Sequence, residues 1–526
     1  MATGNQTSEL DPPQADDPAR GGNTGVAELN DAECEQLSVV RRFGTTGSLL
    51  MALGGMGAGA TPVIDNPLQG VRLFGLATRL PTVSLAVCYL GIGMVILAWL
   101  WLGRLVAAQR GRRLSRSQLD RTLAMWTVPL LFGPPMFSTD VYSYLAQCKI
   151  VAKGLNPYEI GPALALGTDD PLARGVPTIW RDTPSPYGPF FFTYGRIPEW
   201  LAGDNVIAGV LLHRLIALAG IGMIVWALPR LAKRCGVNPV AALWLGAANP
   251  LVLFHLVSGA HNEALMIGLL MVGFEIGLRP GWRMVVLGTA LITLAAAIKI
   301  TAAPALGFLG IALARRHGGR WLDLVKSAVG MGVVFVTVFG ALAVANGLGF
   351  GWLHALETPN KVKSWLSPVT ALGMTTTAVG QAMGLGNHED AVVGVARTLG
   401  TGIAALTVLA LLLISFRGRP FPLEPLAGLG AALGALLVLG PIMHPWYPLW
   451  AMIPLAAVIK SPRFTKAAVI ITVVVAISIP STGAGFFGRA YVLPLAIIAG
   501  IVMLLVPLWF VRGKLPEPAP LPTART

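Results

Sequence analysis

The chain has 526 residues, of which 54% are hydrophobic and only 12% are charged, and its mean hydropathy is +0.67. A soluble domain carries roughly 25% charged residues, so this composition excludes an ordinary water-soluble protein. The net charge of +14 does not indicate nucleic-acid binding, because the Lys and Arg residues lie in clusters between apolar segments. The four cysteines are far apart and predict neither a disulfide framework nor a CxxC metal site.

The two ends of the chain differ from the rest. Residues 1–43 are acidic and contain scattered Pro, Gly and Asn, which predicts a disordered cytoplasmic tail. They lack the basic start and apolar middle of a cleaved signal peptide, so the first membrane segment is expected to act as an uncleaved signal. Residues 44–511 form one predicted polytopic membrane domain, and residues 512–526 form a short cytoplasmic C-terminal tail.

Apolar segments recur along the whole membrane domain and predict an all-α, multi-spanning bundle of twelve to fourteen transmembrane helices. Several are shorter than the roughly 20 residues that a perpendicular helix needs. The predicted segments are 47–64, 82–103, 122–137, 206–227, 240–257, 263–278, 283–298, 301–315, 327–346, 391–415, 424–442, 446–459, 467–482 and 491–511. Basic clusters between them mark the cytoplasmic side, which places both termini inside and residues 137–205 in a long outer loop.

The outer loop begins with FSTDVYSYLAQCKIVAKG, which puts the carboxylate of Asp140 and the rings of Tyr142 and Tyr144 at the predicted water boundary. Ser138 or Thr139 can cap a helix whose remaining apolar stripe predicts that it lies at the membrane interface. A carboxylate in the first helical turn also favours the helix dipole, which is the simpler structural explanation of Asp140. Ionisable groups at the membrane edge tend to be functional, so we favour a catalytic role.

Further along this loop, TIWRDTPSPYGPF combines aromatic and charged side chains at Trp180, Arg181, Asp182 and Tyr187. The dense prolines predict an irregular backbone here. Such residues suit a sugar, whose CH face stacks on rings while its hydroxyl groups bind charged partners. An aromatic belt at the membrane surface explains them equally well.

Other polar residues lie at predicted outer corners or inside apolar segments. A buried arginine is costly unless it is paired, so Arg214 is either a ligand for an anion or a partner of backbone carbonyls or of an acid. The spacing of the two histidines in FHLVSGAHNEALM is not that of a zinc site. The remaining candidates for phosphate, hydroxyl or sugar binding are His261, Asn262, Glu263, Lys299, Lys361, His444 and Trp446.

Together these residues favour a membrane enzyme whose donor substrate is already in the lipid. The chain has no nucleotide-binding loop of the GxxxxGK[ST] type. A polyprenyl phosphosugar meets the requirement, because its leaving phosphate needs cations and its acceptor hydroxyl needs a base. No cofactor or divalent metal is implied.

Six stretches resemble those of the actinobacterial polyprenyl-phosphomannose-dependent α-(1→6)-mannopyranosyltransferases, which build the mannan core of lipomannan and lipoarabinomannan. They are STDVYSYLAQ, GLNPYEIGP, SPYGPF, NPLVLFHLVSGAHNEALMIGL, AIKITA and HPWYPLW, and the resemblance runs from about residue 45 to 510. It implies a GT-C-like fold, a polyprenyl phosphomannose donor and a mannosylated phosphatidylinositol acceptor at the outer face of the plasma membrane. It also implies an inverting transfer in which Asp140 is the base.

The position of Asp140 in the chain differs from that of the catalytic acid in many GT-C enzymes. In many of those enzymes the catalytic acid follows the first membrane helix, whereas Asp140 follows the third predicted one, so Asp182 or Glu263 stays open as the base. Two other function classes also stay open. One is a secondary transporter or a flippase of a lipid-linked sugar, which also has a dozen spans and broken helices. The other is a protein O-mannosyltransferase.

Overall fold

A computed structural model of the chain describes residues 28–62, 66–67, 69–72, 74–107, 114–358, 362–418, 424–483 and 491–515. Within these residues the chain is 75% helical and contains no strand. Lys361 and most of the predicted acidic tail lie outside the described residues. The protein is an all-α, multi-spanning membrane protein, as the sequence predicts.

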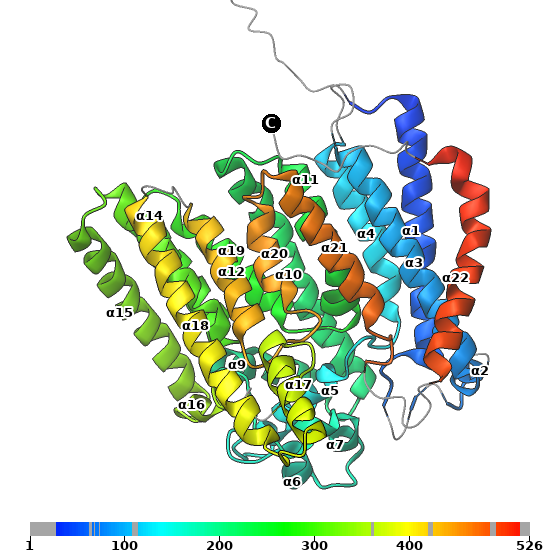
Figure 1. Ribbon diagram of the computed structural model, residues 1–526, viewed down its shortest axis with the longest axis horizontal. Coiled ribbons are helices and arrows are strands. Elements are labelled where there is room, and N and C mark those ends of the chain that lie inside the picture. Colours follow the sequence, from blue (N-terminus) through cyan, green and yellow to red (C-terminus); the bar gives the residue numbers. More distant parts are fainter. Residues whose placement is uncertain are drawn as a thin grey trace, which may run out of the picture.

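The helices of the first half form a continuous series (Figure 1). The N-terminal group is α1 (Asp31–Ala58), α2 (Phe74–Arg79), α3 (Pro81–Val106) and α4 (Arg116–Phe132). The segment that was predicted to be an outer loop then forms five helices, α5 (Asp140–Ala152), α6 (Pro162–Leu166), α7 (Pro171–Gly175), α8 (Thr178–Arg181) and α9 (Pro189–Ala202). The next group is α10 (Val206–Arg234), α11 (Pro239–Gly246), the π-helix η1 (Val252–Ser258) and α12 (Glu263–Gly277).

The second half continues the bundle. Its first group is α13 (Trp282–Ala296), the 3₁₀ turn η2 (Ile300–Ala302), α14 (Pro304–Arg316), α15 (Trp321–Ala345) and the short α16 (Trp352–Ala355). The last group is α17 (Pro368–Ala382), α18 (Glu389–Arg417), α19 (Pro425–Leu439), α20 (Pro448–Ala456), α21 (Pro462–Ser478), α22 (Val492–Val511) and η4 (Arg512–Lys514).

Every apolar segment predicted from the sequence overlaps a helix or, for 240–257, a helix pair. Among the described residues, however, only five helices are both long and apolar enough to cross a membrane, namely α3, α10, α15, α18 and Val492–Lys514. The pair η1 and α12 adds a sixth if it counts as one span bent by 109°. The predicted twelve to fourteen spans are not reached by this criterion, because prolines and polar corners divide most of the remaining segments into shorter helices, and α1, although 28 residues long, is too polar.

The predicted boundary of the N-terminal tail at residue 43 was wrong. Helix α1 begins at Asp31, because the Asn30 side chain accepts a hydrogen bond from the Glu33 N–H at 2.8 Å while the Glu33 carboxylate accepts one from the Asn30 N–H. This reciprocal cap satisfies two backbone groups that the helix start leaves free. The ends of the described chain lie close together, since Lys514 Nζ is 3.3 Å from the Glu35 carboxylate.

Glycines allow several helices to pack closely. A Cβ at Gly220 on α10 would lie 2.3 Å from the Ala264 backbone on α12, and one at Gly91 on α3 would lie 2.5 Å from the Gly47 carbonyl on α1. Small residues at helix contacts are the usual device for close approach in membranes.

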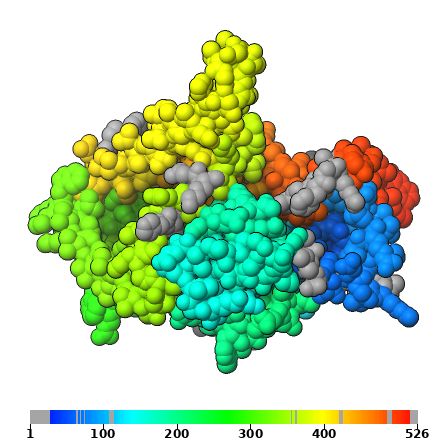
Figure 2. Space-filling model, turned by 90° about the horizontal axis from the view of Figure 1, so that it is seen from below, coloured from blue at the N-terminus to red at the C-terminus, as the bar shows by residue number. Residues whose placement is uncertain are grey.

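The bundle has two distinct ends (Figure 1). One end carries the described chain termini and the first turn of α4, whereas the opposite end carries α5 to α7, α16 and α17. The short helices of the predicted outer loop therefore form a cap over one end of the bundle. Figure 2 views the molecule from this end, and residues of the cap occupy the middle of the visible face.

Candidate active site

The sequence candidates that come together lie beneath the cap, where α5, the corner between η1 and α12, the residue before η2 and the corner before α20 meet. These four segments are brought together by packing of α5 against α9 and α10 and of α10 against η1, α12 and α20. We call the group the polar cluster. Its members are Asp140, Tyr144, Tyr187, His261, Asn262, Glu263, Lys299, His444, Trp446 and Tyr447.

Asp140 begins α5, and its backbone N–H donates to Ser138 Oγ at 3.1 Å. The side chain is not freely exposed, because its relative exposure is 13%. The position of α5 at the membrane interface stays a prediction, but the polar side of the helix does not face water. Its tyrosines and Gln147 are buried as fully as its apolar residues, since α7, α9 and α10 enclose the helix.

The corner after η1 brings His261 to Asp140. Ala260 adopts φ 53°, a left-handed conformation that is unusual for a residue with a side chain, and Phe137 before Asp140 has φ 67°. His261 Nδ1 is 3.7 Å from Asp140 Oδ2, 3.9 Å from Glu263 Oε2 and 3.3 Å from Tyr144 Oη. Two carboxylates and a phenol therefore surround one imidazole nitrogen. Backbone strain of this kind concentrates at functional sites.

Lys299 supplies the positive charge of the polar cluster. Its ammonium group makes an ion pair with the Glu263 carboxylate, whose side chain is fully buried. The ammonium group also lies 5.3 Å from the ring centroid of Tyr447 and 5.9 Å from that of Tyr187. Burial lowers the pKa of Lys299, but the charge and hydrogen bond of Glu263, together with Tyr447 and Asp140, outweigh this effect, so the pKa is raised and the lysine stays charged.

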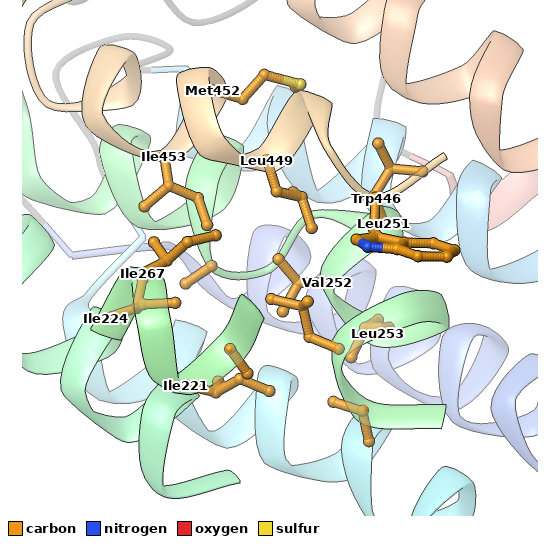
Figure 3. Close-up of a cluster of buried hydrophobic side chains, with 14 of the residues drawn as sticks. Ile221, Ile224, Leu251, Val252, Leu253, Ile267, Trp446, Leu449, Met452 and Ile453 are labelled. Atoms are coloured by element: carbon orange, nitrogen blue, oxygen red, sulfur yellow. The ribbon is translucent and has the colours of Figure 1, made fainter. Parts of the chain in front are cut away.

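A stack of rings forms one wall of the polar cluster. The Trp446 ring stacks on His261 with centroids 3.6 Å apart, and His444 stacks on the same indole at 4.8 Å. Trp180 of the cap lies at the edge of this stack, 6.4 Å from His444. Behind Trp446 the protein is apolar, because Leu251 just before η1, Val252 of η1 and Leu449 of α20 fill the adjoining core (Figure 3).

Several buried polar atoms of the polar cluster have no hydrogen-bond partner in the described protein. They are His261 Nε2, both side-chain atoms of Asn262, Glu263 Oε2 and Trp446 Nε1. An unpaired buried polar group costs about 1–3 kcal/mol, so a convergence of such groups calls for a partner from outside the chain. A sugar, with many hydroxyl groups, is a ligand of suitable chemistry.

Burial tunes the carboxyl group of Asp140. Burial raises its pKa to about 7, with a further rise from Glu263 and opposing effects from the Lys299 charge and the Ser138 hydrogen bond. Helix α5 lies outside the five candidate membrane spans. A group with a pKa near the working pH is well suited to accept and release a proton.

Some predicted site residues lie elsewhere. Arg214 is buried, and it donates to the backbone carbonyls of Leu131 at 2.7 Å, Gly133 at 2.5 Å and Ser258 at 3.0 Å. Both of its terminal nitrogens are thereby used, so backbone partners account for its burial, and the binding of the donor phosphate by Arg214 stays a prediction. The arginine ties the ends of α4 and η1 together.

Three residues of the predicted outer loop also point away from the polar cluster. Tyr142 Oη donates to the Ala60 carbonyl at 2.8 Å. Arg181 donates to the Val176 carbonyl at 2.9 Å, which fixes the turn before α8. Asp182 is exposed directly after α8 and belongs to no ion pair among the described residues. The two charged residues had been candidates because of their aromatic neighbours, yet Arg181 binds backbone carbonyls of the cap and Asp182 is exposed.

Sequence reasoning left out Tyr447, Ser138 and His255 as site residues. Tyr447 lies against Lys299, and Ser138 accepts the Asp140 N–H. His255 lies 5.8 Å from the Trp446 ring and is buried inside η1. The motif HPWYP already contained Tyr447, and a π-helix, which often marks a functional site, cannot be read from the sequence.

Comparison with known proteins identifies the family of the chain. Residues 41–315 match the N-terminal domain model of α-(1→6)-mannopyranosyltransferases, and residues 369–509 match the MptB C-terminal domain model. The chain belongs to the α-(1→6)-mannopyranosyltransferase family. No solved structure matches it.

Individual members of this α-(1→6)-mannopyranosyltransferase family align over most of their length. A probable α-(1→6)-mannopyranosyltransferase of Mycolicibacterium smegmatis is 45% identical over 95% of this chain and 93% of its own. An α-(1→6)-mannopyranosyltransferase of Mycobacterium tuberculosis is 43% identical over 92% and 90%. The α-(1→6)-mannopyranosyltransferase B of Corynebacterium glutamicum is 36% identical over 82% and 77%. The resemblance seen in the sequence is thus confirmed, and the chain is a membrane glycosyltransferase.

Proposed function

We propose that the protein transfers mannose from a polyprenyl phosphomannose to a mannosylated phosphatidylinositol glycolipid and forms α-(1→6) bonds of a lipomannan and lipoarabinomannan core. The observation that carries this proposal is the position of Asp140. In a chain of the mannopyranosyltransferase family, it is a carboxyl group with a raised pKa among unpaired polar atoms and stacked rings.

The proposed reaction is a single inverting displacement. The 6-hydroxyl oxygen of the acceptor mannose forms a bond to the anomeric carbon of the donor while the bond from that carbon to the phosphate oxygen breaks. Asp140 takes the hydroxyl proton, and polyprenyl phosphate leaves with the electron pair. Help of this kind from a positioned base is typically worth about 10²–10⁴ in rate.

The leaving phosphate needs positive charge and hydrogen-bond donors. Lys299 is the cation of the described polar cluster, although the ion pair with Glu263 partly neutralises its charge. Asn262 Nδ2 and Trp446 Nε1 are donors that lack protein partners, and they suit phosphate oxygens or sugar hydroxyls. His261 Nε2 also lacks a protein partner, and in the neutral ring with its proton on Nδ1 it accepts a hydrogen bond from a sugar hydroxyl. Lys361, which lies outside the described residues, stays a candidate for the second cation.

We place the polar cluster at the outer face of the plasma membrane. The arginines at the ends of α10 and α14 and the lysines and arginine around the start of α21 are all at the far end of the bundle from the cap. Positive clusters of this kind mark the cytoplasmic side. The cap and the polar cluster then face outward, where nucleotide sugars are absent and a lipid-linked donor is needed.

The test compares Asp140→Asn with the wild-type protein, both purified at full length, using labelled polyprenyl phosphomannose and a short mannosylated inositol lipid. The variant is expected to fold and to lose at least about 99% of mannose transfer. Near-normal turnover by the variant would move the base to another acid. A peptide-linked product would instead support a protein O-mannosyltransferase, and movement of the intact lipid-linked sugar without a new glycosidic bond would support a flippase.

A further inference from the structure

The end of the bundle opposite the polar cluster is also hollowed. A cavity of about 690 Å³ opens between α13, the end of α14 and α15, and its upper wall is the turn after α12. This volume is within the roughly 300–1,000 Å³ of ordinary ligand pockets. We call it the α13–α15 cavity.

The walls of the α13–α15 cavity are apolar, and its rim is basic. Val285 and Val286 of α13 and Met331 of α15 line the interior, whereas Arg316 and Lys326 lie at the rim. Among the described residues, neither of these two cations pairs with a carboxylate. Arg316 instead donates to the Leu278 carbonyl at 2.6 Å, where α12 ends.

The remaining charges at the rim leave it positive. Arg279 also lines the cavity, but its neighbour Glu275 is shared with Arg234, so one carboxylate serves two guanidinium groups. Asp323 is the acid of the cavity lining, and its side chain accepts the Arg320 N–H at the start of α15. The cations therefore outnumber the acids around the opening.

Helix α15 stands at the edge of the bundle (Figure 1), and only 17% of its most apolar window is buried inside the protein. Its outer face must therefore contact lipid, and the adjoining apolar cavity is accessible to a lipid chain. Trp282, 72% exposed beside the rim, is the type of residue that marks the boundary between hydrocarbon and headgroups. Arg316 and Lys326 at the rim therefore lie at the depth of the lipid phosphate groups.

We propose that the α13–α15 cavity binds an anionic phospholipid, with an acyl chain against Val286 and Met331 and the phosphate between Arg316 and Lys326. Basic pockets between membrane helices on the cytoplasmic side recognise acidic headgroups in this way. A zwitterionic lipid fills the apolar part equally well but gains little from the rim. The site is separate from the polar cluster, and its lipid is neither donor nor acceptor in the proposed reaction.

The test measures lipid binding to the full-length protein in detergent, with dioleoyl phosphatidylglycerol and dioleoyl phosphatidylcholine compared by native mass spectrometry and by the shift in melting temperature. The wild type is expected to prefer phosphatidylglycerol. Each interfacial cation is worth roughly a fivefold change in affinity, so the double variant Arg316→Gln and Lys326→Gln should lose about 25-fold for this lipid alone.

Two further variants separate the site from general surface charge. Arg463→Gln with Lys466→Gln removes the same charge from α21, whose start lies at the same end of the bundle outside the cavity, and should keep the preference. Gly330→Phe fills the cavity from α15, where a Cβ meets no atom within 4 Å, and should weaken binding of both lipids. Equal binding of the two lipids by the wild type, or an equal loss in the α21 control, would overturn the proposal.

Discussion

The base role assigned to Asp140 makes a quantitative prediction about pH. Burial places the pKa of its carboxyl at about 7, and the reacting form is the deprotonated one, so activity must increase as the pH rises through 7. With that pKa, the ionised fraction and therefore kcat/KM should increase about tenfold from pH 6 to pH 8. An acid with an ordinary pKa near 4 would give a flat profile over this range.

The assay is mannose transfer by the detergent-purified protein at saturating acceptor and low donor concentration, in buffers of constant ionic strength. Asp169→Asn is the matched control, because Asp169 is an exposed acid of the same cap that contacts only Arg174 at 3.5 Å. The control should keep the profile, whereas Asp140→Asn should have a flat residual rate. A wild-type rate that is constant or falls between pH 6 and pH 8 would refute the assignment of the base.

Two further predictions concern the surroundings of Asp140, and a third concerns the packing of α10 against α12. Lys299→Met should move the pH profile to higher pH, because the lysine charge lowers the Asp140 pKa. The variant should also lower the free energy of unfolding by roughly 3–5 kcal/mol, because Glu263 stays buried without a partner. Unfolding measured in detergent should show that the double variant with Glu263→Gln recovers part of this free energy. Trp446→Ala should raise the KM for donor or lower kcat at a cost of roughly 0.5–1.5 kcal/mol for each lost ring pair, and Trp446→Phe should restore much of it. Gly220→Ala should lower the free energy of unfolding by roughly 1–3 kcal/mol, because its Cβ clashes with α12. Gly222→Ala on the same helix should be neutral or stabilising, because a Cβ there meets no atom within 4 Å. Equal melting temperatures for the two variants would refute the close-packing explanation.

The sequence predicted where helices form better than how they pack. Apolar period and length located most of the long helices, because burial in lipid or protein imposes the same composition on each. The helix α9 was missed, since dense prolines were read as breakers although Pro189 occupies the first helical position, where no N–H is needed. Helix α17 was missed for another reason, because Thr and Gly residues dilute its apolar pattern.

The candidate site was predicted in part. Asp140, His261 and Trp446 follow from their corners, because a polar residue next to an apolar segment is costly without a function. The ion pair of Glu263 with Lys299 joins residues 36 positions apart, and no local pattern indicates such a contact. The partners of Arg214 could not be predicted for the same reason, because its carbonyl partners on α4 and η1 come close only after the helices have packed.

The left-handed backbone conformation of Phe137 and Ala260 links the thermal stability of the protein to its turnover. A side chain in that conformation costs roughly 1–2 kcal/mol, and glycine would remove the cost. Both residues lie next to segments that aim Asp140 and His261. Glycine at Phe137 would lose more by removing a buried ring that stacks on Phe254, whereas Ala260 has only a methyl group to lose. A search for more heat-stable variants should therefore select glycine at Ala260 and recover proteins that transfer sugar more slowly.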